Sequence, residues 1–247
     1  MNAVHPLTVA ARFAAQNSQR SRGELLVLPG RGENAGLYER LGARIAYDGY
    51  TVTVVELPAP ALVDAAWLEA AAAPAGTGEF GPLTLLGADS GALIAALLAE
   101  RLGASGVVLA GLGGLATAAV SDGDARLDER SACQVHRRRL ADTGADLAAT
   151  SVQRFGPEVA ERLATTRLEV ATLLLHGTAD RITPADEAIA IGRRLHSEPE
   201  TVLVHGGLHD ILNDVSHRST SAEIVQFLER RAGAVLQRGA VALAPAA

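Results

Sequence analysis

The chain has 247 residues, of which 48% are hydrophobic and 20% charged, which fits one α/β domain with an insertion and a sizeable core. Its net charge of -6 argues against a nucleic-acid partner, since phosphate binding needs a basic face. The single cysteine, Cys133, excludes an internal disulfide, and we see neither a signal peptide nor an apolar run of the ~20 residues that a membrane span needs, so a cytoplasmic protein is expected.

Short apolar runs alternate with helical patterns along the chain, which predicts a mostly parallel sheet with helices on both faces. The predicted strands are residues 24–28, 51–56, 83–86, 106–110, 171–175 and 200–204. The predicted helices are residues 36–48, 61–73, 90–102 and 185–195, with one or two more within 210–232.

Two segments depart from this alternation. Residues from about 115 to 168 are charged and lack strand patterns, so we interpret them as a helical cap inserted between two strands of a single domain. Residues from about 236 to 247 are rich in small side chains and are predicted to form a disordered tail.

The first glycine-rich loop follows strand 24–28 and has the sequence PGRGENAGLY. Glycines such as Gly30 and Gly32 let backbone N–H groups point into a pocket. A dinucleotide-binding loop is a weaker interpretation, because the spacing differs from G-x-G-x-x-G and no ribose-binding acid fits.

A sharp strand-to-helix turn is predicted in LLGADSGALIA. The central residue of such a turn has a strained backbone and stands clear of the sheet, and its neighbours two before and two after are small. Gly87 and Gly91 are those neighbours if Asp89 is central, whereas Ala88 and Ala92 are if Ser90 is. The first register is favoured. The alternative is that Asp89 is an ordinary helix N-cap.

An acid and a histidine follow later strands. Asp180 comes after the strand in LLLHGTADRITP, and His209 comes after the strand in VLVHGGLHDILN. The order nucleophile, acid, histidine is that of the Ser-His-Asp type of triad on an α/β sheet. We therefore expect Asp89 or Ser90 as nucleophile, His209 as base and Asp180 as its supporting carboxylate.

The remaining polar groups are expected to play lesser parts. His176 is expected to make structural hydrogen bonds, Asp210 to be a helix N-cap, and no His, Cys or carboxylate pair has convincing metal spacing. His136 or an arginine of 137–139 could donate to a substrate oxygen, although a solvated helix face is the stronger interpretation.

Four segments resemble monoacylglycerol lipase and lysophospholipase-like α/β-hydrolases. PGRGENAGLYERL resembles the family's HGxGEHSGRYxxL, LLGADSGALIA its LLGHSMGGxIA, and LLLHGTADRITP and GGLHDILND its acid and histidine segments. The resemblance implies an α/β-hydrolase fold with a lid at about 115–168, and an oxyanion hole formed by the backbone N–H groups of Arg31 and Ser90. No cofactor is implied.

The chain departs from this family at the nucleophile, because Asp89 aligns with the family's serine. An aspartate there resembles epoxide hydrolases and haloalkane dehalogenases of the same fold, in which the carboxylate forms an alkyl ester that water then splits. We therefore expect a hydrolase of a small, fairly apolar ester, lactone or epoxide. A non-hydrolytic biosynthetic enzyme such as a cyclase, or a ligand-binding pseudo-hydrolase, is the alternative, and a homodimer is left open.

Overall fold

The computed structural model describes residues 7–17, 20–58, 62–71, 81–113, 123–143 and 155–233. The predicted tail at 236–247 and parts of the predicted cap and of helix 61–73 lie outside these residues. In the described part no helix is long and apolar enough to cross a membrane.

Seven strands form one sheet in the order β1-β3-β2-β4-β5-β6-β7. The edge strand β1 is antiparallel to β3, and all other pairs are parallel. The strands are β1 (Thr8–Phe13), β2 (Glu24–Leu28), β3 (Thr51–Glu56), β4 (Leu83–Asp89), β5 (Gly106–Leu112), β6 (Ala171–Gly177) and β7 (Glu200–Val204). The predicted mostly parallel sheet is confirmed.

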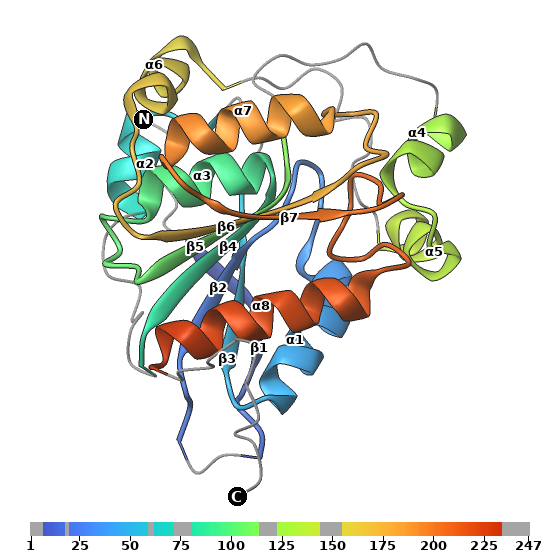
Figure 1. The fold of residues 1–247 in the computed structure, drawn as a ribbon, viewed down its shortest axis with the longest axis horizontal. Helices are drawn as coiled ribbons and strands as arrows, with labels where there is room; N and C mark the ends of the chain where they lie inside the picture. The colour runs from blue at the N-terminus through green and yellow to red at the C-terminus, as the bar shows by residue number, and fades with distance from the viewer. Residues whose placement is uncertain are drawn as a thin grey trace, which may run out of the picture.

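Helices cover both faces of this sheet (Figure 1). One face carries α2 (Ala65–Ala71), α3 (Ser90–Leu98), α6 (Pro157–Thr165) and α7 (Ala185–Leu195). The other carries α1 (Glu39–Tyr47), which follows the 3-10 helix η1 (Ala35–Tyr38), and α8 (His217–Arg231). Helices α4 (Gly123–Arg130) and α5 (Gln134–Asp142) lie at the end of the sheet.

Two apolar cores lie on the two faces of the sheet. The strands contribute side chains to both cores because successive side chains point to opposite faces. Leu26 and Leu28 of β2 belong to one core, and Leu25 and Val27 to the other. Helix α3 is apolar on nearly every side, with eight of its nine residues buried, as expected of a helix inside the protein. This packing holds the carboxyl end of β4 rigidly.

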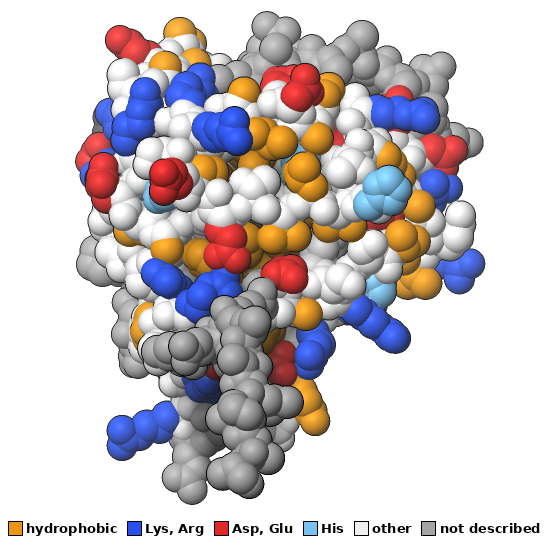
Figure 2. All heavy atoms as spheres, viewed as in Figure 1, with side chains coloured by type: hydrophobic (Ala, Val, Ile, Leu, Met, Phe, Trp, Pro, Cys, Tyr) orange, Lys and Arg blue, Asp and Glu red, His pale blue; other side chains and the backbone are white. Residues whose placement is uncertain are grey.

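The segment between β5 and β6 holds α4, α5 and α6 and, among its described residues, no strand, as its composition predicts. Basic and acidic side chains are interspersed on the face shown in Figure 2. Helix α8 begins seven residues later than the predicted helical segment, because residues 210–216 form turns.

Candidate active site

Asp89 ends β4 and directly precedes the first residue of α3. Its backbone has φ 46° and ψ -119°, a conformation that side chains other than glycine adopt only under strain. A Cβ added to Gly87 would lie 2.3 Å from the Gly91 oxygen, and one added to Gly91 would lie 2.3 Å from the Leu28 and Pro29 oxygens. The elbow is therefore centred on Asp89, and Ser90 is the first residue of the helix.

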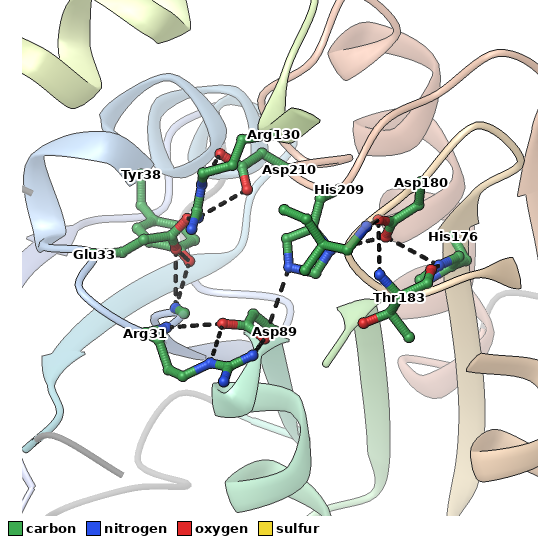
Figure 3. Close-up of polar contacts among 12 residues, drawn as sticks. Arg31, Glu33, Tyr38, Asp89, Arg130, His176, Asp180, Thr183, His209 and Asp210 are labelled. Atoms are coloured by element: carbon green, nitrogen blue, oxygen red, sulfur yellow. Dashed lines mark hydrogen bonds and ion pairs between the residues drawn. The ribbon is translucent and has the colours of Figure 1, made fainter. Parts of the chain in front are cut away.

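Arg31 grips the Asp89 carboxylate with its side chain and its backbone (Figure 3). Nε donates to Oδ2 and Nη2 to Oδ1, each at 2.9 Å, and the backbone N–H donates to Oδ2 at 3.2 Å. The Arg31 side chain is 8% exposed and that of Asp89 is 4% exposed. The N–H expected in an oxyanion hole thus points at an oxygen of Asp89.

Gly30 and Gly32 shape the loop that carries Arg31. The Gly30 N–H donates to Glu33 Oε2 at 2.9 Å, and a Cβ on Gly30 would lie 3.2 Å from the Asp89 Cβ. Gly32 has φ 68°, which favours glycine. The two glycines therefore set the backbone path beside Asp89.

His209 lies between two carboxylates. Its Nδ1 is 2.8 Å from Asp180 Oδ2, and its Nε2 is 3.7 Å from Asp89 Oδ1, which is within ion-pair range but longer than a hydrogen bond. Asp180 Oδ1 accepts the backbone N–H groups of Ile182 at 2.8 Å and Thr183 at 3.0 Å. The three residues predicted from separate strand ends therefore meet in space.

Asp180 also contacts a second imidazole, that of the fully buried His176. His176 Nε2 lies 3.1 Å from Asp180 Oδ2 and 2.9 Å from the Thr183 carbonyl oxygen. Both partners are acceptors, so Nε2 carries the proton. His176 thus makes structural hydrogen bonds that hold Asp180.

The buried charges shift one another's pKa values. Burial acts to raise the pKa of Asp89, but the charge of Arg31 and the contact with His209 hold it well below its usual value. Burial acts to lower the pKa of His209, but the charge of Asp180, the hydrogen bond with Asp180 and the nearby Asp89 carboxylate raise it to about 10. The pKa of Asp180 is lowered against its burial by His209 and His176. At neutral pH the site therefore holds an imidazolium between two carboxylates.

A second buried cluster lies beside the first, and sequence reasoning missed it. Arg130, the last residue of α4, contacts Glu33 Oε1 and both oxygens of Asp210, with Nε donating to Oδ2 at 2.9 Å and Nη2 lying 2.8 Å from Oδ1. Glu33 Oε2 also accepts the Tyr38 hydroxyl. Nothing in LDERS distinguishes Arg130 from an ordinary surface arginine, so only the tertiary structure reveals it.

Two predictions fail at this cluster. His136 is 1% exposed and its Nε2 lies 2.7 Å from Asp210 Oδ2, so the solvated helix face is wrong for this residue. Asp210 does not cap a helix, since Ser216 precedes α8. Its carboxylate is instead the acceptor that joins α4 and α5 to the loop of His209.

A small, partly open hollow lies between the two clusters. Its apolar wall includes Ala88, Ala110, Ile211 and Leu212, and its polar wall includes Glu33, Tyr38, Asp89, His209, Asp210 and Asn213. Ser90 does not line it. Among the described residues no group of three or more His, Cys, Asp or Glu is arranged to hold a metal ion.

No protein-family model matches the chain, and no curated protein sequence matches it. Solved structures do match. A monoacylglycerol lipase from Paleococcus ferrophilus is 20% identical, with a TM-score of 0.68 over 92% of this chain and 100% of its own. For a soluble variant of a Saccharomyces cerevisiae monoglyceride lipase the identity is 16% and the TM-score 0.66, over 89% and 90%.

An esterase from a Rhodococcus species is 18% identical, with a TM-score of 0.63 over 91% of this chain and 98% of its own. All three alignments cover about nine-tenths of this chain. At these identities the likeness concerns the arrangement of the backbone. Together with the observed strand order, it shows that the chain has the α/β-hydrolase fold.

Proposed function

We propose that this protein is a hydrolase that opens a small, fairly apolar substrate at an sp3 carbon bonded to oxygen, through a covalent ester on Asp89. The charged groups around Asp89 favour an epoxide as the substrate. Lactones and alkyl esters also contain an sp3 carbon bonded to oxygen. The observation that carries the proposal is that the two carboxylate oxygens of Asp89 face different groups. Oδ2 accepts the Arg31 backbone N–H at 3.2 Å, while Oδ1 lies 3.7 Å from His209 Nε2.

In the first step Asp89 Oδ1 attacks the carbon and the carbon–oxygen bond of the substrate breaks. The leaving oxygen needs a proton, and the cap tyrosines that usually supply it in epoxide hydrolases of this fold have no counterpart here. His209 is protonated at neutral pH, since its pKa is raised to about 10, and its Nε2 faces Asp89. The imidazolium therefore donates the proton to the leaving oxygen.

In the second step the ester on Asp89 is split by water. Esterification removes the negative charge of Asp89, and His209, now neutral, takes a proton from water as the hydroxide attacks Cγ. The negative charge then develops on Oδ2, where the Arg31 N–H already points. Collapse breaks the bond between Cγ and Oδ1, and Oδ1 leaves on the substrate carbon and takes the proton of the new Asp89 carboxyl group to become a product hydroxyl, so an oxygen from water remains in Asp89.

The balance of this cycle is one epoxide and one water consumed for one diol formed, with Asp89 again ionised and His209 again protonated. Asp180 holds the His209 ring through Nδ1 and stabilises its positive charge. His176 and the N–H groups of Ile182 and Thr183 hold Asp180. The likeness to lipases and esterases supports hydrolysis as the reaction class.

Multiple turnovers in heavy-oxygen water test the proposal. Each cycle exchanges one Asp89 oxygen with water, so mass spectrometry of the peptide containing Asp89 is expected to show incorporated label. Asp89→Asn is expected to stop turnover, and Ser90→Ala to retain it. Labelling of Ser90 by a fluorophosphonate, with loss of labelling in Ser90→Ala, would instead establish a serine mechanism.

A ligand-binding or non-hydrolytic role is the second candidate, because the Arg31 guanidinium occupies both oxygens of Asp89. A protein of that kind would show neither oxygen exchange nor Ser90 labelling. It would still gain thermal stability from its ligand, since a ligand that binds only the folded state stabilises it.

A further inference from the structure

The Arg31–Asp89 pair opposes the attack proposed above. Nη2 of Arg31 donates to Oδ1 of Asp89, the oxygen that faces His209. A hydrogen bond from a guanidinium to each oxygen draws electron density from a carboxylate and makes it a weaker nucleophile. Release of Oδ1 by Arg31 would therefore make that oxygen more reactive towards carbon.

Releasing Arg31 without a replacement anion is costly, because its side chain is buried and its counter-ion is Asp89. A buried guanidinium that loses its carboxylate keeps its charge, since arginine does not deprotonate in proteins. Esterification of Asp89 would leave Arg31 in that state. A neutral substrate carries no negative charge that could pair with Arg31.

We propose that the natural substrate carries a carboxylate beside its reacting carbon, and that Arg31 turns from Asp89 to bind this carboxylate. The inference rests on the proposed function and replaces its fairly apolar substrate with a small anionic one. The incoming carboxylate has the charge and the planar, two-oxygen geometry of the group that it replaces. Binding and activation are thereby linked, because the same movement pairs the substrate and frees Oδ1.

Arg31 is better suited to this exchange than Arg130 because it has one carboxylate partner, whereas Arg130 has two. Nη1 of Arg31 makes no hydrogen bond with the described residues, and it is not sealed from solvent. Arg130 is held between Glu33 and Asp210. In Figure 3 the Arg31 guanidinium lies on the opposite side of Asp89 from that pair.

A binding experiment tests the anion site without any turnover. Asp89→Asn removes the resident carboxylate, so titration calorimetry with propionate is expected to show binding at least about tenfold tighter than to the wild type. Propionamide, of the same shape without the charge, is expected to bind neither protein. The double variant Asp89→Asn, Arg31→Met is expected to lose propionate binding. Equal propionate affinity in Asp89→Asn and wild type would overturn the inference.

A kinetic experiment covers the case in which Asp89→Asn does not fold. The matched substrates are oxirane-2-carboxylate and its amide, and kcat/KM for the carboxylate is expected to be at least about tenfold higher. Arg31→Met is expected to abolish that preference. Arg101→Met, which removes an arginine from an exposed pair with Glu69, is expected to keep it.

The two proposals fail in different ways. Turnover of the acid and the amide at equal rates, with oxygen exchange into Asp89, would overturn the anion site and keep the covalent hydrolase. Propionate binding to Asp89→Asn, with no turnover or exchange for either epoxide in the wild type, would keep the anion site and overturn the hydrolase.

Discussion

Two buried charge clusters lie side by side at one end of the sheet, and they are built from the same residue types. One joins Arg31 to Asp89, with His209 and Asp180 beside them. The other joins Arg130 to Glu33 and Asp210, with His136 beside them. Each contains one arginine, two carboxylates and one histidine.

The clusters differ in how the charges are shared. Arg130 has two carboxylate partners, each of which accepts further donors, so that cluster ties three segments of chain together. Arg31 has one carboxylate partner, and His209 Nε2 lies 3.7 Å from Asp89 Oδ1. The same residue types thus form a structural clamp in one place and a group that can rearrange in the other.

The largest expected effect comes from Asp89→Asn, which keeps the size of the side chain and removes the nucleophile. Turnover of an epoxide is expected to fall by about 10³-fold or more. Steady-state kinetics on oxirane-2-carboxylate measures the loss. Turnover within about threefold of wild type would show that Asp89 is not the nucleophile. The Asp89 cluster would then be a structural one, like that of Arg130.

Arg130→Met is expected to give the largest loss of stability. It leaves Glu33 and Asp210 buried without their cation, which costs about 3–5 kcal/mol. Urea unfolding followed by circular dichroism measures the difference. The matched variant Arg31→Met is expected to cost less, because His209 remains as a cation near Asp89. Equal losses would contradict the distinction between clamp and rearranging group.

Stability is expected to fall as the pH is raised from neutrality towards 10, because the pKa of His209 is raised to about 10 in the folded protein. A raised pKa contributes stability that is complete below the unfolded value of about 6.5 and is lost as the pH passes the folded value. Urea unfolding at pH 7, 8, 9 and 10 measures the slope. His209→Gln is expected to flatten it, and an unchanged slope would assign the effect to another group.

Ser90→Ala is expected to have the smallest effect. Ser90 is the first residue of α3, is 5% exposed and does not line the hollow, so turnover is expected to stay within about threefold and stability within about 1 kcal/mol. Kinetics and urea unfolding on the same preparation measure both quantities. A large loss of turnover at full stability would favour serine chemistry.

Much of the fold was predictable because strand and helix patterns are local. Helix α7 and strand β7 have the predicted bounds. Strand β4 runs three residues further than predicted, to Asp89, because the sequence indicates a turn from Gly87 onward. Strand β1 was not assigned, since it is a largely exposed edge strand with little apolar pattern.

The site was predictable only in part, because local patterns do not show which distant side chains pair. Asp89, Asp180 and His209 each follow a strand, so the topology of the sheet predicts that they meet. The partners of Arg31 and Arg130 are set by side chains far away in the sequence, 58 residues for Asp89 and 80 for Asp210. Neither spacing nor composition carries that information.

The close packing at Gly91 has a consequence for the history of this site. The elbow is packed against the end of β2 through main-chain atoms, so the tight turn depends on the glycines on either side of residue 89. A lineage can therefore exchange the attacking group by a change at one codon without rebuilding the turn. The loop residue opposite, Arg31, would have to change as well. Its positive charge is balanced by an aspartate and would not be balanced by an uncharged side chain at position 89.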